Sequence, residues 1–142
     1  MSSKLIPRST FFLAWLAATL LSGIPSTVWA LVQGGDAAAA TRAAGAMLLP
    51  HETRFAYLLA AAAVVHPLVS LFWAAVLWYL LPRRQLVFSA LAASVAIALI
   101  DLRLIAPAFF PAVAALDFWP QLADHLMWGA TFGAVLTRRL PG

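Results

Sequence analysis

Apolar residues gather in four long runs along the chain, and the segments between the runs hold many of its polar residues and prolines. The runs cover residues 11–32, 55–81, 86–106 and 121–137. A membrane-spanning helix needs roughly 20 mostly apolar residues, because each residue adds about 1.5 Å and the hydrocarbon core is about 30 Å thick. The pattern predicts an all-α membrane protein, a four-transmembrane-helix bundle that forms a single integral membrane domain over residues 1–142.

The connection between the first two runs predicts a short additional helix. Gly34 and Gly35 favour the end of the first span, Asp36 is a good N-cap, and a run rich in alanine follows. We expect an interfacial helix over about 37–49 on the outer side, with a shallow re-entrant segment as the alternative. The other outer connection, 107–120, is rich in proline and aromatic residues, which is typical of a compact segment at the level of the lipid headgroups.

The composition excludes a water-soluble fold. Hydrophobic residues make up 64% of the 142 residues and charged residues only 10%, and the mean hydropathy is +0.93. Soluble domains have about 25% charged residues, which they need to cover their core. The lipid bilayer is therefore the predicted partner of the apolar surface. The chain has no cysteine, which removes disulfides, thiolate metal sites and cysteine nucleophiles.

Charge predicts the orientation of the bundle. Most of the basic residues flank the runs on one side, namely Lys4, Arg8, Arg83, Arg84, Arg138 and Arg139. The positive-inside rule makes that side cytoplasmic, so we expect a bacterial-type inner membrane with both termini in the cytoplasm. All acidic residues map to the outer half. A cleaved signal peptide is the alternative for the first run, but the run is longer than the roughly 7–15 residues of a signal h-region, which favours a retained helix.

Four ionisable residues in or near the spans are candidates for a polar pocket or a proton relay: His66, Asp101, Asp124 and His125. An ionised side chain at the centre of a membrane helix costs about 2.5–3.5 kcal/mol on translocon scales, so such a residue is a functional candidate by default. The structural alternative is that the histidines bond to neighbouring helices or carbonyl groups and that Asp124 favours a helix N-terminus. No catalytic residue is predicted, and the sequence does not identify metal-ligating residues.

Two prolines predict helix kinks within the spans. Pro25 and Pro67 have no N–H to donate, so the carbonyl groups of Leu21 and Ala63 lose their helical partners. His66 directly precedes Pro67, which places an imidazole within one turn of a free acceptor. Both sites are therefore polar positions at depth in the membrane.

Small residues predict where helices pack. Gly129 and Gly133 form a GxxxG step in the fourth span, and such steps let helix backbones approach closely in a membrane. Packing within the chain is the favoured use, and a homo-oligomer or a place in a larger membrane complex is the alternative.

Three functional hypotheses fit these residues. The first is a small accessory or scaffold subunit without enzymatic activity, because little mass is left outside the membrane. The second is a small transporter or a proton or cation pathway through His66 and Asp101. The third is a component of a membrane redox enzyme that binds haem or a metal through His66 and His125; no other cofactor is predicted. Phosphate-binding loops and nucleotide motifs are missing, and the basic residues form no stripe for nucleic acid.

Overall fold

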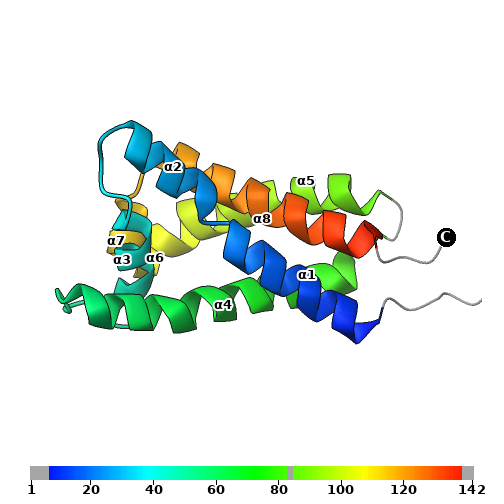
Figure 1. Cartoon of the computed structure of the whole chain (residues 1–142), viewed down its shortest axis with the longest axis horizontal. Helices are drawn as coiled ribbons and strands as arrows, with labels where there is room; N and C mark the ends of the chain where they lie inside the picture. Colours follow the sequence, from blue (N-terminus) through cyan, green and yellow to red (C-terminus); the bar gives the residue numbers. More distant parts are fainter. Residues whose placement is uncertain (1–6, 83–84, 139–142) are drawn as a thin grey trace, which may run out of the picture.

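The computed structural model describes residues 7–82 and 85–138, which form helices and contain no strand. The basic residues Lys4, Arg83, Arg84 and Arg139, which carry much of the predicted orientation, lie outside the described residues. The long helical segments run side by side, and shorter helices gather at one end of the bundle (Figure 1). The predicted all-helical fold is confirmed for the described part of the chain.

Three helical segments among the described residues are long and apolar enough to cross a membrane. The first, Arg8–Val32, consists of α1 (Arg8–Leu21) and α2 (Ile24–Val32) and bends at Ser22 and Gly23. Pro25 lies in the first turn of α2, where its missing N–H costs nothing and its fixed φ favours a helix start. The kink expected at this proline is therefore a break between two helices.

The second and third segments are α4 (Phe55–Leu80) and the combined helix Leu86–Phe109. Pro67 lies inside α4 without ending the helix. The combined helix consists of α5 (Leu86–Ile100), a five-residue π-helix η1 (Asp101–Ile105) and α6 (Ala106–Phe109). π-helical turns are rare in proteins, and those that occur are often found at functional sites. The π-helix η1 begins at Asp101, one of the predicted site residues.

The remaining long helix is α8, Phe118–Arg138, which covers the predicted run 121–137. It is not among the helices that qualify as spans by hydropathy. Its first half holds Gln121, Asp124 and His125, which lower its mean hydropathy. It nevertheless lies inside the bundle, where it packs against α5, α1 and α2.

Short helices close the end of the bundle that is opposite Arg8 and Arg138 (Figure 1). The expected helix over 37–49 is α3, Ala39–Ala46, which crosses this end and packs on α4. Gly45 permits this contact, because a Cβ at its position would overlap the backbone of Leu58. The connection expected over 107–120 contains the end of α6, the short helix α7 (Pro111–Ala114) and the start of α8.

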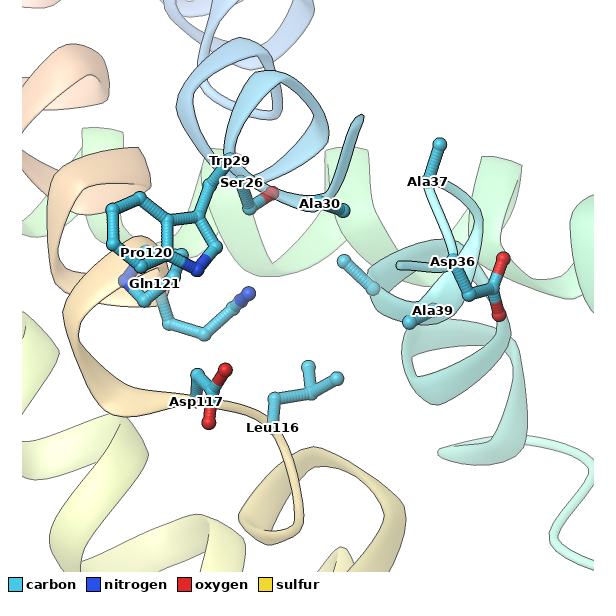
Figure 2. Close-up of a pocket in the computed structure, with 11 residues that line it drawn as sticks. Ser26, Trp29, Ala30, Asp36, Ala37, Ala39, Leu116, Asp117, Pro120 and Gln121 are labelled. Atoms are coloured by element: carbon cyan, nitrogen blue, oxygen red, sulfur yellow. The ribbon is translucent and has the colours of Figure 1, made fainter. Parts of the chain in front are cut away.

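A shallow recess of about 80 Å³ lies at this end, between the α2–α3 connection and the start of α8 (Figure 2). Asp36 and Asp117 lie on opposite sides of it, one from each connection. Ser26 of α2 and Gln121 of α8 also line the recess, so it adjoins the two helices that carry the buried polar groups described below.

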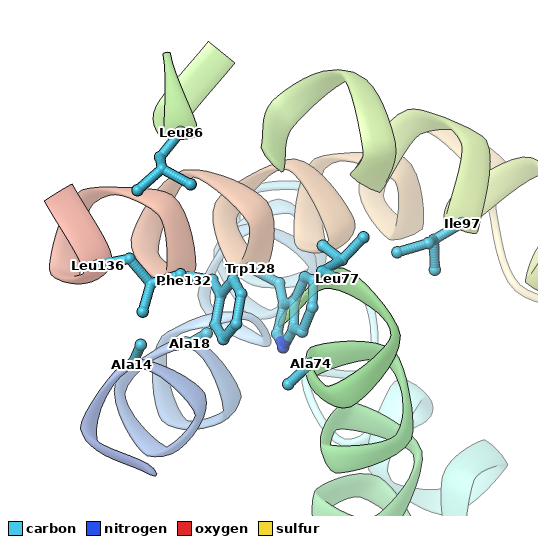
Figure 3. Close-up of a cluster of buried hydrophobic side chains, with 9 residues drawn as sticks. All are labelled: Ala14, Ala18, Ala74, Leu77, Leu86, Ile97, Trp128, Phe132 and Leu136. Atoms are coloured by element: carbon cyan, nitrogen blue, oxygen red, sulfur yellow. The ribbon is translucent and has the colours of Figure 1, made fainter. Parts of the chain in front are cut away.

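The apolar core lies where α8 meets α1, α4 and α5 (Figure 3). Trp128 and Phe132 of α8 stack with ring centroids 5.3 Å apart. Ala14 and Ala18 of α1 lie beside the Phe132 ring, and Ala74 of α4 lies beside Trp128. Small side chains on the surrounding helices thus leave room for two large rings on the central one.

Candidate functional site

Asp124 joins α8 to the start of α2. Its Oδ1 accepts a hydrogen bond from the backbone N–H of Ser26 at 2.8 Å. The first N–H groups of a helix have no partner within the helix, and the positive end of the helix dipole favours a carboxylate there. Asp124 therefore caps a helix other than its own, and the break at Gly23 is what exposes the backbone group that it binds.

His66 bonds from α4 to the end of α1. Its Nε2 lies 3.2 Å from the carbonyl oxygen of Thr19 and 3.3 Å from Ser22 Oγ. A carbonyl oxygen can only accept, so Nε2 carries a hydrogen, and in the neutral ring Nδ1 is then an acceptor. Nδ1 has no hydrogen-bond partner among the described residues, and the side chain is exposed on the surface of the bundle.

A chain of hydroxyl groups lies next to His66. Trp128 Nε1 donates to Ser70 Oγ at 2.8 Å, and Ser70 Oγ lies 2.6 Å from Thr19 Oγ1. Because Thr19 Oγ1 donates to the carbonyl oxygen of Trp15, Ser70 donates to Thr19. The Trp15 indole in turn donates to the carbonyl oxygen of Pro67 at 3.3 Å. These bonds connect α8, α4 and α1 and satisfy polar groups that would be costly in an apolar interior.

Asp101 and His125 meet on another side of α8. Asp101 Oδ2 lies 3.5 Å from His125 Nε2 and accepts a hydrogen bond from Trp73 Nε1 at 3.0 Å. His125 Nδ1 lies 2.8 Å from the carbonyl oxygen of Gln121, one turn earlier in α8. Asp101 thus faces inward from the first residue of the π-helix, and each ring nitrogen of His125 faces an oxygen atom.

The four predicted residues therefore do not converge on one pocket: two of them form a pair, and the other two bond separately to α1 and α2. Asp101 contacts His125, whereas His66 bonds to α1 and Asp124 bonds to α2. Asp124 directly precedes His125 in α8, but among the described residues no hydrogen bond or ion pair joins Asp124 to either histidine. Within the described ranges, no three His, Asp or Glu residues are grouped as a metal site would require.

A haem held by His66 and His125 fits this arrangement poorly. His66 has a free ring nitrogen, but His125 would have to release Gln121 or Asp101 before it could bind iron. The visible absorbance spectrum of the purified protein tests this hypothesis directly, because bound haem gives a Soret band.

The remaining charged residues near the site have partners of their own. The Arg103 guanidinium lies 4.3 Å from the centre of the Phe118 ring, so Asp101 and Arg103 point to different surroundings. Glu52 forms a two-point ion pair with Arg54, with Nε–Oε1 at 3.0 Å and Nη2–Oε2 at 2.8 Å. These hydrogen bonds lower the pKa of Glu52 to about 2. Asp36, which lines the recess, pairs with Arg42.

Gly129 and Gly133 face α5. A Cβ on Gly129 would lie 2.6 Å from Ser94 Oγ, and one on Gly133 would lie 2.8 Å from the Cα of Val87. Both glycines are buried. The GxxxG step is therefore used for packing within the chain.

Sequence reasoning missed most of the groups that bond to the predicted residues. Trp73 and Trp128 are donors inside the bundle, and Ser22, Ser26 and Ser70 are partners of the ionisable residues or of the indoles. The tryptophans and serines within the apolar runs were a usable signal for these hydrogen bonds. A buried indole N–H usually finds a partner, and a serine in an apolar run needs one as well. The spacing alone does not tell which serine meets which tryptophan.

No protein-family model, no curated protein and no solved structure matches this chain. The fold and the site therefore define its class by themselves. Over residues 7–82 and 85–138 the protein is all-helical, with three helices long and apolar enough to span a membrane and a more polar long helix, α8, that packs against α5, α1 and α2.

Proposed function

We propose that this chain is a four-span integral protein of a bacterial-type inner membrane, with α8 as the fourth span. Large apolar side chains are exposed along the three apolar segments, for example Leu20, Leu68 and Phe88, which are 59–71% exposed. Lipid is the environment in which such a surface is favourable. α8 needs little apolar surface of its own, because it packs against α5, α1 and α2.

The cysteine-free chain allows this topology to be tested with single-cysteine variants. Ser9 is exposed at the start of α1 and Thr53 is exposed in the connection before α4, at the opposite end of the bundle. In intact cells, a membrane-impermeant maleimide should label Thr53→Cys and should label Ser9→Cys only after the membrane is opened. Labelling of Ser9→Cys from outside would contradict cytoplasmic termini.

Within that topology, we propose that the protein acts as a non-enzymatic accessory or scaffold subunit that docks through α4. This proposal is based on the face of α4 that points away from the rest of the bundle. Ala56, Ala60 and Ala63 are exposed there at helical spacing, and His66 follows on the same face. Small residues let a second helix approach closely, and the unpartnered Nδ1 of His66 is an acceptor that lipid does not satisfy.

The partner that fits this face is a transmembrane helix that presents a hydrogen-bond donor at the depth of His66. The other small-residue face, Gly129 and Gly133, is already occupied by α5. Within residues 7–82 and 85–138, the α4 face combines exposed small residues with an unmet hydrogen bond.

Crosslinking of two matched variants tests the docking proposal. Ala60→Cys places a thiol on the α4 face, and Ala96→Cys places one at an exposed alanine of α5. We expect a specific crosslinked complex in native membranes for Ala60→Cys and none for Ala96→Cys. In addition, His66→Ala should weaken the complex. A strictly monomeric species without a partner in both variants would reject the docking proposal.

A second candidate function is a proton or cation pathway, and the contact between Asp101 and His125 inside the bundle favours it. Four helices are few for such a pathway, so several copies would have to assemble. Flux into proteoliposomes should fall in Asp101→Ala and His66→Ala. Unchanged flux in both variants would reject this function while leaving the accessory role intact.

A further inference from the structure

Charged side chains at the end of the bundle that α3 crosses, the α3 end, form ion pairs with few exceptions. Asp36 pairs with Arg42, and Glu52 pairs with Arg54. Asp117, in the connection before α8, is an exception, because among the described residues no ion pair and no hydrogen bond reaches its exposed carboxylate. This end of the bundle therefore holds an exposed negative group that the described part of the chain does not neutralise.

Arg103 is the matching positive group. Its guanidinium lies 4.3 Å from the centre of the Phe118 ring, which holds the cation in place, and Phe118 directly follows Asp117 in the chain. Arg103 is exposed, and within residues 7–82 and 85–138 it forms an ion pair neither with Asp117 nor with another carboxylate. A positive and a negative group thus lie close to Phe118 without forming a salt bridge to each other.

The recess adds a second acceptor beside Asp117. Figure 2 shows the Asp117 carboxylate and the Gln121 side chain directed into the same space, with Trp29 of α2 beside them. The side-chain amide of Gln121 has no hydrogen-bond partner in the described ranges, so its oxygen is free to accept. A group that carries a positive charge and several N–H donors satisfies the carboxylate and the amide oxygen together.

We infer that this surface binds the head group of a phospholipid with a primary ammonium, as in phosphatidylethanolamine. The ammonium donates to Asp117 and Gln121 in the recess, and the phosphate pairs with Arg103. Hydrogen bonds between an ammonium and a carboxylate are strong, and a guanidinium matches the oxygens of a phosphate. A choline head group has no N–H to donate and a glycerol head group has no positive charge, so neither satisfies Asp117 in this way.

This inference rests on the membrane insertion proposed above and adds a ligand to it. Trp29, which lines the recess, is 49% exposed, and Trp119, next to the recess residue Pro120, is 73% exposed. Exposed tryptophans are typical of the level of the lipid head groups. A zwitterionic head group carries both charges on one short segment, which suits the separate positions of Asp117 and Arg103. A simple amine would leave Arg103 without a partner.

Native mass spectrometry of the detergent-solubilised full chain tests the inference, with one lipid added at a time. Phosphatidylethanolamine, phosphatidylcholine and phosphatidylglycerol are compared with identical dioleoyl chains. We expect phosphatidylethanolamine to bind about threefold more tightly than either of the others, the scale of an exposed ion pair. In Asp117→Asn, the preference over phosphatidylcholine should disappear. In Arg103→Gln, the affinity for all three lipids should fall about threefold, because each of them carries a phosphate.

Glu52→Gln and Arg54→Gln are the matched controls, because each removes the same kind of charge at the α3 end but outside the recess. They should change the lipid affinities by less than about 1.5-fold. Asp117 and Arg103 are exposed, so the circular dichroism of their variants should match that of the unchanged chain. The inference is overturned if the unchanged chain does not prefer phosphatidylethanolamine, or if Asp117→Asn keeps the preference.

A soluble head group distinguishes a membrane lipid from a free amine as the source of the ammonium. Glycerophosphoethanolamine carries the same charges without acyl chains, and in excess it should compete with phosphatidylethanolamine, whereas glycerophosphocholine should not. Binding of glycerophosphoethanolamine as tight as that of the whole lipid would overturn the lipid as the ligand. Maleimide labelling and crosslinking at α4 involve neither the recess nor an added lipid, so failure of the lipid test is distinguishable from failure of the proposed topology or docking.

Discussion

Helices α4 and α8 are both long enough to cross a membrane, but they differ in which side chains they expose on the surface of the bundle. α4 has 26 residues and exposes large apolar side chains such as Phe72 and Tyr79 along its length. α8 has 21 residues, and none of residues 120–136 is exposed. In the membrane that we propose, α4 meets lipid and α8 meets protein. A span that is enclosed by other helices can carry Asp124 and His125, because its neighbours supply their partners.

This comparison predicts that the core of α8 is more sensitive to substitution than the outer face of α4. Phe132 is fully buried, whereas Phe72 is 59% exposed. Phe132→Ala should lower the free energy of unfolding by about 3–5 kcal/mol, the range for a buried phenylalanine, because a cavity replaces the ring stacked on Trp128. Phe72→Ala should change it by less than about 0.5 kcal/mol.

Unfolding in mixed micelles, followed by circular dichroism, measures both variants under the same conditions. Equal losses for Phe132→Ala and Phe72→Ala would mean that α8 is not the enclosed helix. The comparison between the two helices would then have to be abandoned.

The glycines of α8 provide a second test of the difference between α8 and α4. In Gly129→Val, the new side chain would meet Ser94 and the carbonyl oxygen of Ala90, which a Cβ would approach to 2.8 Å. Overpacking of this kind costs about 1–3 kcal/mol. Ala60→Val adds bulk to the exposed face of α4 and should leave the stability of the isolated chain unchanged. If α4 is the docking face, the same variant should weaken the complex, which co-purification from native membranes measures.

The contrast between α4 and α8 also explains what the sequence could predict. Apolar runs fix where long helices form, so α4 and the run 121–137 are readable from composition and length. The use of Gly129 and Gly133 inside the chain follows from backbone contacts with α5 that no spacing rule specifies. The positions of the long helices are therefore easier to predict from the sequence than which helices pack against one another.

The candidate site was only partly predictable for the same reason. The sequence predicts Asp101 as a candidate for a polar pocket, because an ionisable residue in a span is a functional candidate by default. That it meets His125 depends on the π turn at Asp101 and on the rotation of α8, which are results of packing. The bond from Ser26 to Asp124 depends on a helix break that Pro25 suggested only as a kink.

Asp124 gives a smaller test of the polar side of α8. Asp124→Ala should lower the free energy of unfolding by about 1 kcal/mol, because the N–H of Ser26 loses its acceptor at the start of α2. Asp124→Asn keeps an oxygen that can accept this bond and should recover part of the loss. Chemical denaturation of both variants checks the order. A stability of Asp124→Ala equal to that of the unchanged chain would remove Asp124 as a cap of α2.

The smallest effect is expected outside the bundle, at the ion pair before α4. The pKa of Glu52 is lowered to about 2 by hydrogen bonds from Arg54, below its usual value of 4.5. A carboxyl group whose pKa is depressed by folding stabilises the folded state above its unfolded pKa, and this contribution is lost as the pH falls from about 4.5 toward 2. The pair is near the surface, so the effect is small and screened by salt. Thermal unfolding of the unchanged chain and of Glu52→Gln should therefore differ slightly at pH 6 and converge near pH 2, and a difference that persists at the lower pH would assign the effect to something other than this carboxylate.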